Sequence, residues 1–316
     1  MSIRKIAKLA EVSTSTVSRV INQHPYVSEE IRQRVLDVMT TINYDPNRNA
    51  INLSNGQSNV IGVIVPYIRD SCYDQLIEGI LEEATKQNKK VMLLLTFFNK
   101  DLEKNYYTLL RDKTLDGIII TSRTQDNQFL LELNQFGPIV VTEKTSIEHI
   151  PTVYPDRSGV YHKVFEFIQT LDANAQIFIT VHRNKEESSS TKLKTTLFSE
   201  YFPNKKIQDV FQSGISTYDD GYRLGIELFR NSSTPLIVYC NNEQVAGGFY
   251  KAGEEAGFVL NKDFYLIDEN NQLLSQVLSI SSLEFHLQKV GKQAVKHLIT
   301  KATGHVKIDC DFIVRG

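Results

Sequence analysis

From Val60 onwards, short and almost uninterrupted apolar runs alternate with longer amphipathic segments, and this alternation restricts the fold more than any other feature of the chain. The first runs are VIGVIVPY at Val60–Tyr67, KVMLLLT at Lys90–Thr96, DGIIIT at Asp116–Thr121 and PIVVT at Pro138–Thr142. A strand that is apolar at successive positions is buried on both faces, and in parallel sheets helices supply that cover. This region is therefore predicted to be an α/β unit with a parallel sheet.

The same rhythm returns further along the chain. The runs there are Gln176–Val181, Ile207–Phe211, Pro235–Tyr239 and Phe264–Ile267, followed by a helix near 287–301 and a strand at His305–Val314. Two successive α/β units of similar size predict two lobes with a cleft between them. Ligands of open α/β sheets bind beyond the carboxyl ends of the strands, so the cleft is the expected binding site.

Residues 2–45 have a different pattern, which predicts three short helices around a small apolar core. Ser13 and Ser28 are expected to cap the second and third helices. Because only three residues separate the first two helices, they form a helix-turn-helix, whose second helix can enter the major groove of DNA. A three-helix module that contacts another protein is the alternative.

The reading helix of such a motif presents its N-terminal side chains to base edges. Thr14, Ser15 and Ser18 are the expected base contacts, and Thr16 and Arg19 are better placed for phosphates. Asn22, at the end of this helix, completes the DNA-binding set predicted for the helix-turn-helix.

The distribution of charge weakly supports a DNA-binding segment at the N-terminus. The 316 residues carry 35 basic and 37 acidic side chains, so there is no global basic bias. Residues 1–60, however, hold seven basic and five acidic side chains, and the excess lies where DNA contacts are expected.

The remaining composition excludes several classes of protein. The three cysteines lie far apart in sequence, so we expect free thiols and neither a disulfide framework nor a zinc site. No apolar run approaches the length of a membrane span, and no apolar stretch follows the first basic residues. A soluble, cytoplasmic protein is expected. None of the GxSxG, P-loop, HExxH and GxGxxG motifs is present, which argues against an enzyme, a metal and a cofactor.

In combination, the motifs IAKLAEVSTSTVSRVIN and YDPNRNAINLSNGQS, followed by VIGVIVP, resemble the lactose-repressor/galactose-repressor (LacI/GalR) family over essentially the whole chain. The resemblance implies a headpiece at 1–45, a hinge at 46–59 and an effector-binding and dimerisation core at 60–316. Lobe one is expected at about 60–156 plus a segment near 285–302. Lobe two is expected at about 157–284 plus the C-terminus.

The resemblance also implies how DNA is bound. Family members are dimers or tetramers that read a pseudo-palindromic operator, and a hinge leucine from each chain wedges into the central minor-groove step. Leu53 stands at that position, and an apolar wedge that kinks DNA explains a leucine in a polar linker. Asn47, Arg48 and Ala50 of the same hinge are the further DNA contacts that the resemblance implies. Packing of Leu53 against its own core is the alternative. Glu11 occupies a turn position where the family often has glycine, which predicts strain.

The core resembles sugar-binding proteins of the periplasmic type, so the resemblance implies an effector site on strand ends of both lobes. In the first lobe, a carboxylate and aromatic faces suit a sugar, and the candidates are Tyr67, Asp70, Tyr73, Arg123, Glu143 and Tyr154. In the second lobe, family positions are matched by Lys194 in place of arginine, Asn242 and Glu243 in place of Asn-Asp, and Asn270 in place of an acidic residue. The stretch at 185–190 is predicted to be a solvated loop and helix start.

Three classes of protein are compatible with parts of this sequence. A repressor controlled by a small molecule explains headpiece, hinge and lobes together. A free-standing sugar-binding protein explains only residues 60–316, and an enzyme lacks a recognisable catalytic set. The effector is predicted to be a sugar or sugar derivative; a phosphorylated sugar, a nucleobase or a partner protein stay open, as does the choice between inducer and corepressor.

Overall fold

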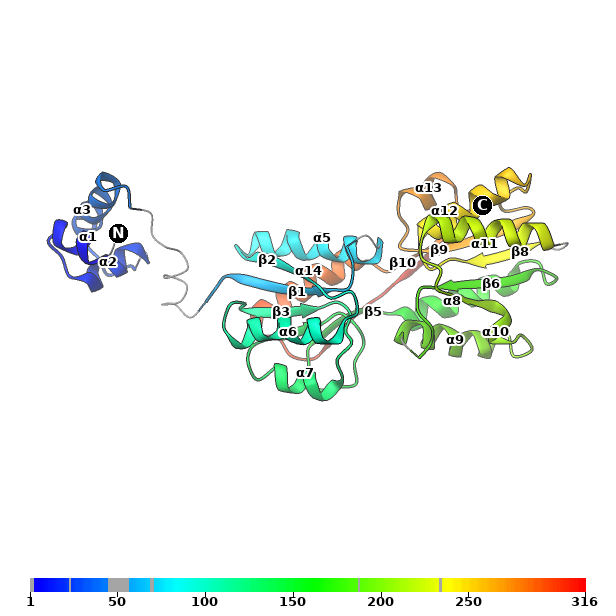
Figure 1. Cartoon of the computed structure of the whole chain (residues 1–316), viewed down its shortest axis with the longest axis horizontal. Coiled ribbons are helices and arrows are strands. Elements are labelled where there is room, and N and C mark those ends of the chain that lie inside the picture. Colours follow the sequence, from blue (N-terminus) through cyan, green and yellow to red (C-terminus); the bar gives the residue numbers. More distant parts are fainter. Residues whose placement is uncertain (1–2, 23, 45–56, 69–70, 187, 233–234) are drawn as a thin grey trace.

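The computed structural model describes residues 3–22, 24–44, 57–68, 71–186, 188–232 and 235–316. They form a three-helix headpiece and a core of two lobes, each built on a six-stranded sheet (Figure 1). The predicted fold class is confirmed. No helix in the described ranges is long and apolar enough to cross a membrane.

The headpiece consists of α1 (Ile3–Leu9), α2 (Thr14–Ile21) and α3 (Glu29–Thr41) around a small core. Its buried members are Ile6, Ala7, Ala10, Val17, Val20, Val35 and Met39. Ser13 caps α2 as predicted, since its Oγ accepts a hydrogen bond from the Thr16 backbone N–H at 3.1 Å. Ser28 occupies the N-cap position of α3, but its side chain makes no capping hydrogen bond. Glu11 has a φ of 54°, the left-handed region in which a residue with a Cβ is strained.

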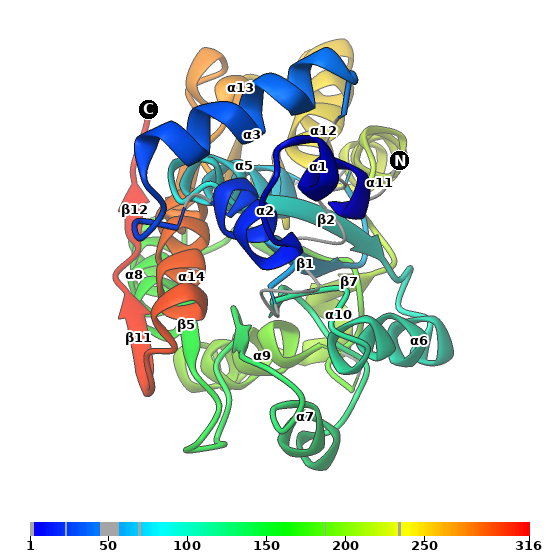
Figure 2. The ribbon, with the colours of Figure 1, turned by 90° about the vertical axis from the view of Figure 1, so that its left-hand side faces the viewer.

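The first lobe contains β1 (Val60–Val65), α5 (Ser71–Lys86), β2 (Lys90–Leu95), α6 (Lys100–Arg111), β3 (Gly117–Ile120), α7 (Asn127–Leu133), β4 (Ile139–Val141) and β5 (Thr152–Pro155). Later in the chain, α14 (Leu287–Thr300) and β11 (His305–Ile308) join it. Its parallel sheet has the order β11-β5-β4-β3-β1-β2. Helices α5 and α14 cover one face, and α6 and α7 cover the other (Figure 2).

The second lobe contains α8 (Arg157–Thr170), β6 (Gln176–Val181), α9 (Ser189–Tyr201), α10 (Ile207–Val210), β7 (Phe211–Ser213), α11 (Tyr218–Asn231), β8 (Leu236–Tyr239), α12 (Glu243–Glu255), β9 (Phe264–Glu269), α13 (Leu273–Val277), β10 (Ser281–Glu284) and β12 (Asp311–Ile313). The sheet order is β12-β10-β9-β8-β6-β7, and only the β10–β12 pair is antiparallel. Helices α8 and α9 cover one face, and α11 and α12 cover the other.

The chain passes between the lobes after β5, after β10 and between β11 and β12. The predicted strand at His305–Val314 is therefore two strands in different sheets, separated by Asp309 and Cys310. The predicted strand at Ile207–Phe211 is also wrong over most of its length. Ile207 and Val210 are three residues apart, so one turn of helix brings both toward the core, and only Phe211 begins a strand.

In both lobes a helix pair packs backbone against backbone. A Cβ at Gly79 of α5 would overlap the Gln288 carbonyl, and a Cβ at Gly291 of α14 would overlap the Leu76 carbonyl. The α11–α12 pair has the same construction, with Gly221 against Val245 and Gly248 against Tyr218. Each pair therefore depends on the absence of a side chain at these positions.

Candidate functional site

The start of α2 presents a polar and accessible surface. Thr14, Ser15 and Arg19 are exposed, and Thr16 and Ser18 are half-buried. Ser13 Oγ lies 2.7 Å from Ser15 Oγ and 2.8 Å from Thr16 Oγ1, which orders this turn.

The other predicted DNA contacts divide into two groups. Asn22, at the C-cap of α2, is half-buried, and its Nδ2 lies 3.4 Å from Ser18 Oγ. Asn47, Arg48, Ala50 and Leu53 lie outside the described residues.

The linker enters the core at a carboxylate. Asp116 accepts hydrogen bonds from the Ser58 and Asn59 backbone N–H groups, at 2.5 and 2.9 Å, and from the Lys89 ammonium at 3.0 Å. Burial acts to raise the pKa of Asp116, but the hydrogen bonds from Lys89 and Ser58 outweigh it and lower that pKa. The charged carboxylate therefore ties the end of the linker to the base of β1.

A cavity of about 440 Å³ lies between the lobes. Its walls come from the loops after β1, β3, β4 and β6, the β5–α8 crossover, the ends of β8 and β9, and the first turns of α5, α9 and α14. Six of the effector candidates line it, namely Tyr67, Tyr73, Glu143, Tyr154, Lys194 and Asn242. Asp70 lies outside the described residues.

The other three candidates do not line this cavity. The Arg123 guanidinium donates to the Gln125 carbonyl and to Asn127 Oδ1, both at 2.8 Å. Glu243 accepts from the Leu274 backbone N–H at 3.1 Å. Asn270 is buried, with a φ of 84°, and its carbonyl oxygen accepts from Gln75 Nε2 of the first lobe at 3.0 Å.

A buried ion pair forms part of the second-lobe wall. Lys194 Nζ lies 2.7 Å from Glu269 Oε1, and the Tyr239 hydroxyl donates to the same oxygen at 2.6 Å. Burial lowers the pKa of Lys194, and the charge and hydrogen bond of Glu269 offset this only in part. The acidic group that faces Lys194 is thus Glu269, one position before the predicted Asn270. It was recognisable as the last residue of the strand FYLIDE.

Two arginines of the cavity were not predicted, Arg157 and Arg183. The Cζ of Arg157 lies 4.4 Å from the centre of the Phe285 ring, and the Cζ of Arg183 lies 3.8 Å from that of Phe98. Burial acts to lower the pKa of Arg157, but Tyr161, among other neighbours, outweighs it and raises that pKa, so this guanidinium stays charged. One signal was available, because each arginine stands two residues after a strand.

Glu143 faces these arginines from the first lobe. Burial raises the pKa of its carboxyl group, and the charges of Arg123, Arg157 and Arg183 counteract part of that effect. The Ser122 side chain also hydrogen-bonds to Glu143. Glu143 therefore places a carboxyl group near the two arginines, from the first-lobe side of the cavity.

The lobes touch on both sides of the cavity. On one side Arg183 stacks on Phe98, and the His182 ring lies 6.2 Å from the Tyr67 ring. On the other side, Gln272 Nε2 lies 3.2 Å from Asp74 Oδ1, beside the Gln75–Asn270 contact. A ligand in the cavity would therefore be enclosed by both lobes.

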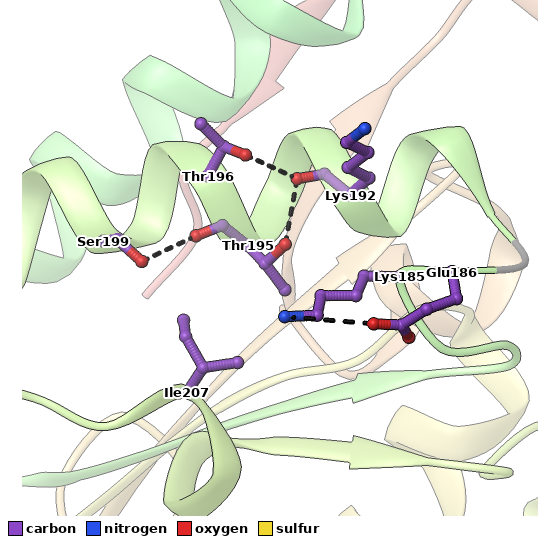
Figure 3. A pocket seen from close by; sticks show the side chains of 7 residues that line it. All are labelled: Lys185, Glu186, Lys192, Thr195, Thr196, Ser199 and Ile207. Carbon is purple, nitrogen blue, oxygen red and sulfur yellow. Dashed lines mark hydrogen bonds and ion pairs between the residues drawn. The ribbon is translucent and has the colours of Figure 1, made fainter.

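A second hollow, also of about 440 Å³, lies on the other side of α9 (Figure 3). Thr195, Thr196 and Ser199 line it, and their hydroxyls donate to carbonyls of their own helix. Lys185 and Glu186 at its rim are exposed, and Lys185 Nζ lies 3.9 Å from Glu186 Oε1. Because the charged side chains of the outer hollow are solvated, the inter-lobe cavity is the better candidate site. The start of α9, Ser188–Thr191, lines that cavity and not the outer hollow. The stretch at 185–190 does contain the predicted helix start, but its Ser188–Ser190 segment faces the inter-lobe cavity.

Comparison with known proteins covers almost the whole chain. Residues 2–47 match the model of bacterial regulatory proteins of the lacI family, and residues 58–315 match that of periplasmic binding proteins and the sugar-binding domain of the LacI family. Catabolite control protein B of Bacillus subtilis is 33% identical over 311 residues, which are 98% of both chains. The HTH-type transcriptional repressor PurR of Mannheimia succiniciproducens is 26% identical, over 95% of this chain and 91% of its own. Among solved structures, the Lac repressor dimer bound to operator and an anti-inducer superposes with a TM-score of 0.84 at 20% identity, covering 100% of this chain and 98% of that one.

Proposed function

Because this chain belongs to the lacI family of bacterial regulatory proteins, we propose that it is a transcriptional repressor that binds an operator as a homodimer and is controlled by a small molecule between its lobes. One observation carries this function. A helix-turn-helix with an exposed polar reading edge and a two-lobed core with an enclosed cavity occur in one chain. Such a regulator acts on chromosomal DNA, which places it in the cytoplasm, and its function requires no catalysis.

On the DNA side, Thr14, Ser15 and Ser18 contact bases, while Thr16, Arg19 and Asn22 position the helix on phosphates. Two headpieces related by the dimer axis read the half-sites of a pseudo-palindrome. In the linker, Asn47, Arg48 and Ala50 lie along the minor groove, and Leu53 of each chain enters the central base step. These linker roles rest on the motif alone.

On the effector side, the aromatic faces of Tyr67, Tyr73 and Tyr154 accommodate a sugar-like molecule, and Glu143, Lys194 and Asn242 offer polar groups. An effector that binds one lobe arrangement more tightly changes the affinity of the protein for its operator. By linkage, operator DNA changes the affinity for that effector by the same factor. The Asp116–Ser58 contact supplies a physical route, because it joins the first lobe to the linker.

A gel-shift titration tests the proposal. The full chain should bind a pseudo-palindromic DNA from its own upstream region more tightly than a scrambled duplex of equal length, at matched salt. Equal affinity for both duplexes would contradict sequence-specific binding. Sugar binding by a chain that shows no preference for any operator would instead favour a free-standing sugar-binding protein.

A further inference from the structure

The charged groups that line the inter-lobe cavity do not balance one another. Glu269 is paired with Lys194 at 2.7 Å, and Asp156 is paired with Lys307 at 3.0 Å, so these carboxylates are already neutralised. The remaining charged groups of the wall are Lys144, Arg157, Arg183 and Glu143.

None of these four groups has an oppositely charged partner within 4.0 Å among the described residues. Among the described residues of the wall, three cations and one carboxylate leave a net charge of about +2. The raised pKa of Glu143 works in the same direction, since protonation of that carboxyl group makes the wall more positive still.

The two arginines share a geometry that suits anion recognition. The Arg157 guanidinium lies over the ring of Phe285, and the Arg183 guanidinium lies over the ring of Phe98. Stacking holds a guanidinium in place without using all of its N–H edge, which is the part that binds phosphate or carboxylate in a bidentate manner. The first turn of α9 lies on the same cavity and adds a positive helix end.

We infer that the effector carries a phosphate monoester, and that Arg157 and Arg183 bind this group. The inference rests on the proposed function, because it specifies the ligand of the same cavity. A phosphate monoester has a charge of about −1.5 to −2 at pH 7, which matches the unpaired charge of the wall, whereas a neutral sugar leaves that charge unopposed. Glu143 and the aromatic faces of Tyr67 and Tyr73 are then left for the polyhydroxylated part.

The test is calorimetry on the full-length protein with matched probes. The panel contains aldose and ketose monophosphates, the corresponding free sugars, glucuronate as a sugar with a carboxylate, and inorganic phosphate. At least one monophosphate should bind at least 30-fold more tightly than its free sugar, and inorganic phosphate at millimolar concentration should compete with it. Glucuronate should bind more weakly than that ester.

Arg183→Leu, on an accessible loop, should weaken ester binding at least 30-fold. Arg230→Leu removes the same charge from an exposed position on α11 of the same lobe and should change nothing. Arg157→Lys keeps the charge at the crossover but loses the planar N–H edge, so it should also weaken the ester.

Several results overturn the inference. With the wild-type protein, these results are free sugars that bind as tightly as their esters, glucuronate that binds as tightly as the best ester, or no binding of any phosphate compound. With the variants, the refuting result is that Arg183→Leu and Arg157→Lys both bind the ester as tightly as wild type. Operator binding in the absence of effector is measured in parallel on the wild type. Loss of operator specificity contradicts the proposed function, whereas failure of the ester alone contradicts only the phosphate assignment.

Discussion

Replacing Lys194 by methionine tests whether the cavity wall depends on its buried ion pair. The side chains of Lys194 and Glu269 are only 4% and 10% exposed, and their charged atoms are 2.7 Å apart. Lys194 Nζ also lies 4.2 Å from the centre of the Tyr239 ring. Methionine keeps the length and apolar stem of lysine but leaves Glu269 with the Tyr239 hydroxyl as its remaining donor in this cluster.

The expected cost follows from the burial of the orphaned charge. Removing one partner of a buried pair destabilises a protein by about 3–5 kcal/mol, whereas removing both charges together is often close to neutral. Lys194→Met should therefore lower the free energy of unfolding by about 3 kcal/mol or more, and Lys194→Met combined with Glu269→Gln should recover most of that loss. Lys192→Met, an exposed position on the same helix, should stay within about 0.5 kcal/mol of wild type.

Urea unfolding followed by circular dichroism measures all of these variants, and calorimetry adds effector binding. If Lys194→Met is as stable as Lys192→Met, Lys194 does not stabilise the buried charge of Glu269. The double variant separates stability from recognition. Should it fold normally and still bind effector like wild type, Lys194 is part of the wall without being a ligand contact.

Three further results are expected. Changing both Thr14 and Ser15 to alanine should weaken operator binding by about 1–3 kcal/mol per lost base contact and leave binding to random DNA nearly unchanged, as gel shifts at matched salt will show; equal operator affinity would remove both from the reading edge. Leu53→Ala should reduce operator bending in circular-permutation gel shifts together with specific affinity, and an unchanged bend would exclude Leu53 as the wedge. Burial raises the pKa of Asp268 from 3.8 to about 7, so the native state holds a proton that the unfolded state releases between these pH values. The stabilising contribution of the protonated Asp268 carboxyl group is fully present below pH 3.8 and is lost as the pH rises through about 7. In urea titrations, Asp268→Asn should therefore become more stable relative to wild type as the pH rises from 3.8 to about 7, and a difference in stability that does not change with pH would refute this.

The fold was predictable because its main signals are local. Continuous apolar runs such as Val60–Val65 identify buried parallel strands, and the cap at Ser13 is visible from sequence. The one-turn helix at Ile207–Val210 was not predictable from sequence. A short apolar segment with two core residues fits a strand equally well, and only packing against the rest of the lobe decides between strand and helix.

The candidate site was predictable only in part, since a cavity joins residues that are distant in sequence. Tyr67 and Glu143 follow strands of one lobe and could be placed from that fact. The roles of Arg157 and Arg183 depend on Phe285 and Phe98, which reach them from other segments. The prediction named Asn270, one position after Glu269. Which of these two neighbouring polar residues faces the cavity depends on where the strand ends, and the sequence does not determine that position to one residue.

The glycine contacts between α5 and α14 have a mechanical consequence. Backbone packed on backbone leaves no side-chain layer between the two helices at these glycines, so we expect α5 and α14 to move as one rigid unit. Both helices begin at the cavity, through Tyr73 and Leu287, while β1 of the same lobe begins at the far end, beside the Asp116–Ser58 contact. With six residues at about 3.3 Å each, β1 spans roughly 20 Å, so a tilt of about 5° at the crossovers displaces the base of the linker by nearly 2 Å. If an effector tilts the first lobe in this way, we expect the displacement to reach the DNA side through the Asp116–Ser58 contact.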